Sequence, residues 1–358
     1  MSVILAILLA VLMFSLLVFV HELGHFVAAK LSGVQVNEFA MFMGPAIVKW
    51  KWGQTQYSIR CIPIGGYCAM EGEDEDTDNP HSFQKAAWWK RLIILVAGSA
   101  MNLLVGFLIM LVFYMPMQNM GQPVIESFAD FATVDGENGL QVGDRILEMD
   151  GEKIYVLSDV FLFFNLNSGD VHDFVLERDG QKVYLDNFAM EKHPVKDANG
   201  NEEMQYGITF ATDYDLSFVD KLHFAWNDSI NTVRSIRLSL QMLFTGKAGV
   251  SEVTGPVGIV AMMSDTAQNS KNALEAVWKL LYFSAFLAIN LGVMNLLPIP
   301  ALDGGRVFGL LVTSGIQAIT RKKLNPKFEG YIHGVGMILL LVLMALIMFK
   351  DVIFIFKR

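Results

Sequence analysis

The sequence predicts a membrane protein that is mainly α-helical, with four transmembrane helices and one soluble α+β domain. Hydrophobic residues make up 53% of the 358 residues, and the mean hydropathy of +0.41 is too apolar for an ordinary soluble protein. Four long apolar runs are separated by polar connectors. The net charge of −9 is concentrated in residues 115–274, where acidic residues outnumber basic ones. This acidic block argues against nucleic-acid binding.

The first transmembrane helix is expected within residues 1–30. Val3 to Val20 is interrupted only by Ser15, and as a helix it would cover roughly 27 Å. No basic segment or small-residue cleavage site of a secretory signal accompanies it, so we expect the helix to be retained. The run ends in His21-Glu22-Leu23-Gly24-His25. Ionisable residues inside a span are costly, which indicates that these residues have a function.

The spacing of this motif is typical of a zinc site. His21 and His25 are four residues apart and therefore share one helix face. Two such histidines bind Zn²⁺ in the His-Glu-x-x-His pattern, in which the glutamate acts as the base. The pattern alone is weak, because unrelated helices also contain it, and zinc needs a third protein ligand.

The second apolar helix is expected at 92–115, after a connector at 31–91. The connector has short β-prone runs between Gly-Pro and Gly-Gly breakers, which indicates irregular strands or a hairpin. Its acidic run, Glu71 to Asp78, is interpreted as a solvated loop. Ala87 to Arg91 carries two tryptophans and two basic residues, a pattern typical of a membrane interface. Asn102 and several small residues interrupt the second span, and the small residues favour close helix packing.

The soluble block is assigned to residues 120–212. Phe174 to Val183 alternates around Asp179-Gly180, which predicts a hairpin. Gly139-Leu140-Gln141-Val142-Gly143-Asp144-Arg145-Ile146 resembles the signature of a PDZ domain, and we find one such domain. By this resemblance, Gly207 and Ile208 belong to the loop that forms the peptide groove.

The remaining chain is divided into four segments. Residues 213–275 are expected to hold an interfacial or domain-packing helix from Phe218 to Phe244, followed by a loop around Val253–Gly258. The third transmembrane helix is assigned to 276–305, with Pro298 and Pro300 ending its apolar run. A basic connector at 306–330 precedes the fourth transmembrane helix at 331–350. His333 is interpreted as an interfacial histidine.

Asp303 is the candidate third ligand. It lies in Ala301-Leu302-Asp303-Gly304-Gly305, just after the third apolar run, and by itself it would more often be a turn former. Four spans bring the end of the first run and the end of the third run to the same membrane face. His21, His25 and Asp303 would therefore meet there, and two histidines with one aspartate leave an open zinc position.

Basic residues predict the orientation in the membrane. Lys and Arg are frequent in 31–91 and 306–330, which indicates that these connectors are cytoplasmic. The basic residues Lys350, Lys357 and Arg358 on the other side oppose this assignment. The acidic domain would then lie outside the cytoplasm, in the periplasm of a Gram-negative cell.

Two motifs together resemble those of bacterial site-2 proteases of the regulator-of-sigma-E type. One is the His21–His25 motif, and the other is Asn295-x-x-Pro298-x-x-x-Leu302-Asp303-Gly304-Gly305. Ile62 to Tyr67, the Trp89-Lys90-Arg91…Ala97-Gly98…Asn102 segment and Thr254 to Gly258 also look similar. Several relatives carry two PDZ domains, and Ser99 stands where they usually have proline.

This resemblance implies a bacterial inner-membrane zinc metalloendopeptidase that cuts within the transmembrane segments of single-span proteins, such as anti-sigma factors or signal-peptide remnants. It implies zinc on His21, His25 and Asp303, with Glu22 as the catalytic base. A membrane-associated β-hairpin near 54–70 would receive an extended substrate. Asn295 would hold substrate backbone or the oxyanion, although a bond to a neighbouring helix explains an asparagine equally well. No organic cofactor is expected.

Two alternatives are weighed. In the first, a glutamate from a later helix would be the third zinc ligand, but no later span contains a suitable glutamate and Glu329 lies in a connector. In the second, the chain is a catalytically inactive PDZ scaffold in the membrane. The presence of both Glu22 and Asp303 argues against that scaffold. Cys61 and Cys68 suggest no role, since two cysteines make neither a disulfide framework nor a second zinc site.

Overall fold

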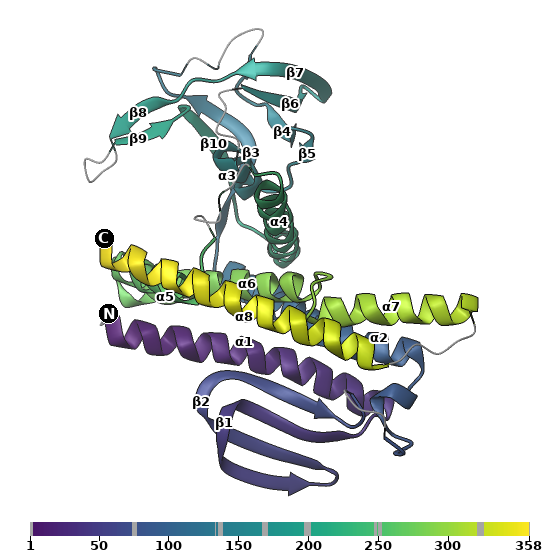
Figure 1. Cartoon of the computed structure of the whole chain (residues 1–358). Coiled ribbons are helices and arrows are strands. Elements are labelled where there is room, and N and C mark those ends of the chain that lie inside the picture. The colour runs from purple at the N-terminus through teal and green to yellow at the C-terminus, as the bar shows by residue number, and fades with distance from the viewer. Residues whose placement is uncertain are drawn as a thin grey trace. The chain divides into compact units, whose positions relative to one another are not determined.

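The computed structural model describes residues 3–73, 77–132, 134, 139–166, 171–196, 202–246, 249, 253–320 and 326–357. The chain forms two compact units (Figure 1). We call Met1–Met110 together with Ile236–Arg358 the helical unit, and Leu111–Ser235 the sheet unit. Glu329 and His333 lie in a helix, but their side chains are outside the described part.

Six helices build most of the helical unit. They are α1 (Val3–Ser32), α2 (Trp88–Tyr114), α5 (Pro256–Gln268), α6 (Ala273–Asn295), α7 (Asp303–Thr320) and α8 (Pro326–Lys357). Among the described residues, four helical segments are long and apolar enough to cross a membrane: Val11–Ser32, Trp88–Tyr114, Ala273–Asn295 and Gly334–Ile353. This number of apolar helices is the predicted one.

Close approach between α1 and α2 organises the helical unit. Gly24 of α1 faces the backbone of α2, where a Cβ added to it would lie only 2.4 Å from the Ala97 carbonyl oxygen. An apolar core then joins the ends of these helices to the nearby strands and to α7, through residues such as Ala29, Val36, Ile94 and Leu310. On another side, Leu17 of α1 packs with α6. Glycine permits the shortest of these contacts because any side chain would displace a helix.

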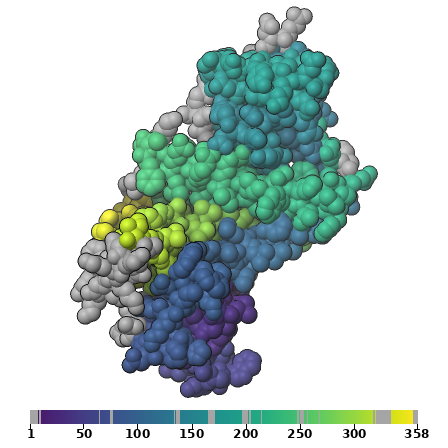
Figure 2. Space-filling model, turned by 90° about the vertical axis from the view of Figure 1, so that its right-hand side faces the viewer, coloured from purple at the N-terminus to yellow at the C-terminus, as the bar shows by residue number. Residues whose placement is uncertain are grey.

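Two long strands, β1 (Val36–Trp52) and β2 (Thr55–Met70), pair in an antiparallel sheet beside α1. The pairing is irregular, because residues 38–41 pair with 66–69 and also with 56–59. Ser15, the polar residue inside the first apolar run, donates a hydrogen bond of 2.9 Å to the Pro63 carbonyl oxygen and so ties α1 to β2. The sheet forms a lobe at the end of the helical unit (Figure 2).

The far part of this sheet exposes apolar side chains. Trp52 is 77% exposed and Ile47 is 68% exposed, with Val48 and Trp50 between them about half exposed. Lys49 and Lys51 alternate with the tryptophans, as at membrane interfaces. These side chains are compatible with the predicted membrane association, which stays a prediction.

The loop after β2 differs from the solvated loop that was predicted. Within Glu71–Asp78, the described Glu73 carboxylate is 17% exposed and forms an ion pair with Arg306 of α7. A short 3₁₀ helix, Phe83–Lys85, then leads to α2.

The segment assigned to the third transmembrane helix, 276–305, contains parts of two helices, and its apolar helix ends before the prolines as expected. α6 ends at Asn295, and Asp303 begins the separate helix α7, which runs to Thr320 through most of the predicted connector at 306–330. Pro298 and Pro300 lack the backbone N–H that a continuing helix needs, so the chain is not helical between the end of α6 and the start of α7.

The loop predicted around Val253–Gly258 is also shorter than expected, because Pro256 begins α5. Proline is well suited to the first turn of a helix, where its missing N–H has no partner to lose. Asp351 of α8 supplies the acceptor for this helix end: its Oδ2 accepts hydrogen bonds from the backbone N–H groups of Gly255 at 3.0 Å and Gly258 at 2.9 Å. Asp351 is 5% exposed, so this contact satisfies a buried carboxylate and two backbone donors at the start of α5 together.

The sheet unit is built around an antiparallel sheet with the strand order β10-β3-β4-β6-β7, with β5 paired to β4. Its elements are β3 (Asn119–Phe128), β4 (Arg145–Met149), β5 (Glu152–Lys153), α3 (Leu157–Leu166), β6 (Val171–Arg178), β7 (Gln181–Ala189), β8 (His193–Lys196), β9 (Glu202–Gln205) and β10 (Ile208–Tyr214). The predicted hairpin at Asp179-Gly180 is confirmed, since both residues have positive φ between the paired strands β6 and β7. The PDZ assignment stays a prediction.

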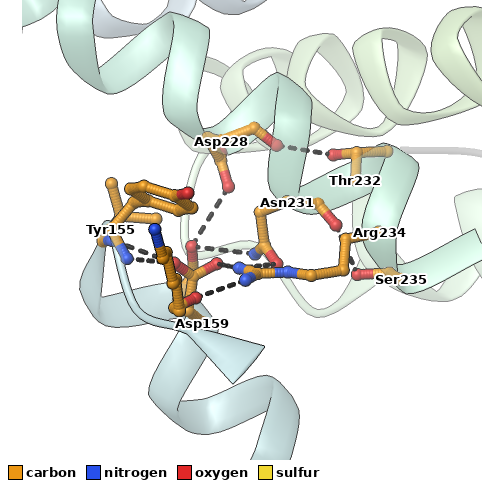
Figure 3. A network of polar contacts seen from close by, with 10 residues as sticks. Tyr155, Asp159, Asp228, Asn231, Thr232, Arg234 and Ser235 are labelled. Carbon is orange, nitrogen blue, oxygen red and sulfur yellow. Dashed lines mark hydrogen bonds and ion pairs between the residues drawn. The ribbon is translucent and has the colours of Figure 1, made fainter. Parts of the chain in front are cut away.

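Helix α4 (Phe218–Phe244) has the predicted bounds, and two of its charged residues in the sheet unit, Asp228 and Arg234, are buried. Arg234 is 8% exposed and forms an ion pair with Asp159 of α3, which is fully buried (Figure 3). Asp228 accepts hydrogen bonds from Tyr114 at 2.7 Å and Ser158 at 3.1 Å. These charges therefore attach α4 to α3, as in the domain-packing interpretation of this helix.

Replacing Asp351 tests the contact between α8 and α5. Asp351→Ala leaves the N–H groups of Gly255 and Gly258 without their acceptor, so we expect a loss of about 1–3 kcal/mol of stability and a lower melting temperature in detergent. Asp351→Asn keeps an acceptor oxygen and should melt closer to the parent. Gly315→Ala, at a position with open space around it, is the control. An unchanged melting temperature in Asp351→Ala would contradict this role.

Candidate metal centre

Helix α1 carries three of the predicted site residues. His21 and His25 are buried, and Glu22 lies against the sheet. His21 and His25 are each 7% exposed, and their Nε2 atoms lie 3.2 Å apart. The four-residue spacing makes one helical turn, so the two rings meet one above the other. Glu22 is only partly buried and lies against β2: a Cβ added to Gly66 would be 3.5 Å from the Glu22 Cγ.

Asp303 completes the cluster from the start of α7. Its Oδ2 lies 3.0 Å from His21 Nε2 and 3.1 Å from His25 Nε2. A carboxylate in the first turn of a helix is stabilised by the unpaired N–H groups there. The structure therefore brings together the three residues that were predicted as metal ligands.

The two glycines after Asp303 allow α7 to begin so close to the preceding chain. A Cβ on Gly304 would lie 2.3 Å from the Leu296 carbonyl oxygen, and one on Gly305 would lie 2.3 Å from the Ile299 carbonyl oxygen. Ala301 has a φ of 79°, a conformation that a non-glycine residue seldom adopts. The chain thus turns sharply between the prolines and Asp303, and this turn aims the carboxylate at α1.

The three candidate ligand atoms have the spacing that zinc requires. His21 Nε2, His25 Nε2 and Asp303 Oδ2 lie 3.0–3.2 Å from one another. Around a tetrahedral Zn²⁺ with bonds of roughly 2.0–2.1 Å, ligand atoms are separated by about 3.3 Å. The donor set of two imidazoles and a carboxylate is also one that zinc accepts and that leaves one position open.

Gly98 of α2 makes the space for this cluster. A Cβ at position 98 would lie 2.3 Å from His25 Nε2 and 2.8 Å from His21 Cε1, so any side chain would fill the centre itself. The cluster and the space beside it therefore fit a metal ion. Gly98 was not predicted as a site residue, because in the sequence it is one of several small residues in the second span.

Helix α2 also contacts the outer nitrogens of both histidines. His25 Nδ1 lies 2.8 Å from the Ile94 carbonyl oxygen. His21 Nδ1 lies 3.3 Å from Asn102 Nδ2 and 3.5 Å from Asn295 Nδ2. Asn295 was predicted as a site residue. Asn102 was not, although it was noted as a polar residue inside an apolar run and as the end of a segment that resembles site-2 proteases.

The remaining predicted residues lie elsewhere. Gly207 and Ile208 belong to the sheet unit, where Gly207 has a φ of 73° and Ile208 begins β10. Cys61 is exposed and Cys68 is buried, and neither belongs to the metal-ligand cluster found among the described residues.

A polar cluster crosslinks β1 and β2. Arg60 donates to the Glu38 carboxylate at 2.8 Å and to the Gly44 carbonyl oxygen, and Ser58 donates to Glu38 at 2.7 Å. Desolvation opposes ionisation of Glu38, but the hydrogen bonds from Ser58, Arg60 and Tyr67 outweigh it and lower the pKa of Glu38 to about 2. Glu38 therefore stays ionised, and it crosslinks β1 to β2 through Ser58 and Arg60.

Comparison with known proteins identifies the family. The sequence pattern of peptidase family M50 matches residues 9–343. A putative zinc metalloprotease of Clostridium acetobutylicum is 33% identical over 97% of this chain and 97% of its own length. One from Fusobacterium nucleatum is 34% identical over 96% and 98%. The regulator of sigma-W protease RasP of Bacillus subtilis is 25% identical over 96% and 97%.

The family match and the apolar helices together indicate a membrane protein, and the relatives' names agree with a centre built for zinc. The chain belongs to peptidase family M50, the site-2 protease family, and is a zinc metalloprotease.

Proposed function

We propose that this protein is an intramembrane endopeptidase that hydrolyses peptide bonds within the transmembrane segments of single-span proteins. The observation that carries the proposal is the meeting of His21, His25 and Asp303 on helices that belong to an apolar bundle. In this proposal the three residues hold the zinc ion.

When bound, zinc would supply Lewis acidity: it would polarise a substrate carbonyl and lower the pKa of water, so that the water can lose a proton and attack near neutral pH. Glu22 is the general base in this proposal. Its position between the histidines places its carboxylate beside their shared face, where it takes the proton of the attacking water. The same carboxyl group then delivers that proton to the nitrogen of the departing amine.

Asn295 is proposed to bind the substrate backbone or the oxyanion. Its amide is next to His21, with Nδ2 3.5 Å from the Nδ1 of that ring. It is the last residue of α6, where an amide can turn from a neighbouring helix to a substrate.

The edge of β2 is the proposed binding site for the unwound substrate. A peptide bond within a helix is shielded by its neighbours, so the substrate has to be extended before it can be cut. Residues 66–69 pair with 38–41 on one side, and no other described strand pairs with their second edge. Strand addition at Gly66 would place the substrate backbone beside Glu22.

The sheet unit is proposed to act as a PDZ-type size filter that excludes substrates with large outer domains. β10, which begins at Ile208, is a terminal strand of its sheet, and Phe210 of β10 contacts Phe161 of α3 with ring centroids 5.9 Å apart. An edge strand beside a helix is the form of groove in which PDZ domains bind peptides. Gly207 and Ile208 would lie at its start.

We further propose that the protein lies in the bacterial inner membrane. The basic residues of 31–91 and 306–330 support a cytoplasmic location for the metal centre, and the acidic 120–212 block supports an extracytoplasmic sheet unit. The RasP relative is named for the regulation of sigma-W, which supports anti-sigma factors as a substrate class.

Glu22→Gln tests the proposed base. The amide cannot take a proton, so cleavage of a single-span substrate in proteoliposomes should fall by about 10²–10⁴-fold while zinc content stays at the parent level. Glu191→Gln, on an exposed residue of the sheet unit, is the matched control. Parent-level cleavage by Glu22→Gln would contradict the mechanism.

Asp303→Ala tests the metal ligand. Removing the carboxylate leaves two histidines, so zinc affinity should fall by more than the roughly 10–100-fold that is typical of residues that only orient a ligand. Zinc content after dialysis against a chelator is the measurement, with the exposed Asp186→Ala as control. If Asp303→Ala keeps its zinc, the centre has a different third ligand.

A further inference from the structure

Asn102 is a polar side chain in the middle of α2, a mostly apolar helix. It is fully buried, and its Oδ1 has no hydrogen-bond partner among the described residues. A buried amide oxygen without a partner costs about 1–3 kcal/mol, so its isolation calls for an explanation. The other end of the same amide, Nδ2, lies 3.3 Å from His21 Nδ1.

The direction of this hydrogen bond follows from the chemistry of His21. Its Nε2 faces His25 and Asp303, so a metal ion at this point takes the lone pair of Nε2. The proton of the neutral ring must then be on Nδ1, which becomes a donor and needs an acceptor. An NH₂ group cannot accept, whereas the amide oxygen can.

Rotation of the Asn102 amide by a half-turn gives the Nδ1–H group of His21 the acceptor that it needs. The oxygen and nitrogen of an amide have nearly the same shape, and their assignment rests on the hydrogen bonds they make. After rotation, Oδ1 lies where Nδ2 was, next to His21 Nδ1–H, and it gains the partner it lacked.

The second histidine provides an internal comparison. His25 Nδ1 faces the Ile94 carbonyl oxygen at 2.8 Å, an atom that can only accept. Ile94 and Asn102 are both on α2, so one helix offers an oxygen to each ring. For His25 the oxygen is backbone, and for His21 a side chain has to supply it.

Asn295 is the competing partner of His21. Its Nδ2 is farther away, at 3.5 Å, and its residue is only partly buried at the end of α6. Asn102 is closer and fully buried, and its Oδ1 makes no other hydrogen bond to the described residues.

We propose that Asn102 is a positioning residue, whose side-chain oxygen accepts the Nδ1 proton of His21 and so holds that ring as an Nε2 ligand of the metal. This inference rests on the proposed function, since it requires His21 to bind zinc. Residues in this role orient the ring and raise its basicity, and losing them typically lowers metal affinity by roughly 10–100-fold.

The test measures zinc affinity by competition with a chromogenic chelator on purified full-length protein, independently of proteolysis. Asn102→Leu keeps a similar volume but offers no acceptor, and we expect its zinc affinity to fall by roughly 10–100-fold. Asn102→Asp has only acceptor oxygens, and we expect it to stay within about threefold of the parent. A melting curve for each variant shows that the fold is retained.

The aspartate variant separates the proposal from a packing role or a donor role. If Asn102→Asp loses as much affinity as Asn102→Leu, the side chain acts as a donor or by packing, and the proposal is wrong. Parent affinity in Asn102→Leu would also overturn it. Asn295→Leu is the matched control, and a loss there equal to that of Asn102→Leu would move the role to Asn295.

Failure of this inference is distinguishable from failure of the proposed function. If Asp303→Ala loses zinc and Asn102→Leu keeps it, the metal centre stands and only the role of Asn102 falls. If Asp303→Ala keeps zinc, the metal centre itself is wrong, whatever Asn102 does.

Discussion

The close contact between α1 and α2 is the constraint on which the rest of the helical unit depends. Polar rings buried in an apolar bundle have to find partners, because no water is available to replace them. Gly24 and Gly98 let the two helices approach until the rings of His21 and His25 lie against the backbone of α2. At that separation the Ile94 carbonyl oxygen reaches His25, and Asn102 reaches His21. Wider spacing would leave both rings without outer partners.

The broken helix after α6 follows from the same requirement. A continuous helix would carry residue 303 farther along its axis, away from α1. Two prolines stop the helix, a residue with positive φ turns the chain, and two glycines let α7 start against the loop it has just left. The result is a carboxylate that points back at α1 from the first turn of a new helix. The positive φ of Ala301 is backbone strain that accompanies the placement of a third ligand beside the histidines.

The chain uses buried charges for different purposes in its two units. In the sheet unit, Asp159 and Arg234 join α3 to α4, and every oxygen of the Asp159 carboxylate has a donor. In the helical unit, Asp351 satisfies the first N–H groups of α5. In both, the carboxylate accepts hydrogen bonds that hold helices in place. His21, His25 and Asp303 instead face one another with space left at Gly98, which is the arrangement of a site that receives a cation.

The sequence by itself determined the features that depend on local spacing. The turn between His21 and His25, the number of long apolar helices, the bounds of α4 and the hairpin at Asp179-Gly180 all follow from neighbouring residues. The motif at Asp303 also marked the third member of the cluster. Only the tertiary structure decided that Gly98 clears the space, that Asn102 contacts His21, that α7 is a helix and that Asp351 caps α5. Each of these joins residues far apart in the chain, and a local pattern holds no information about which distant backbone will approach within hydrogen-bonding distance.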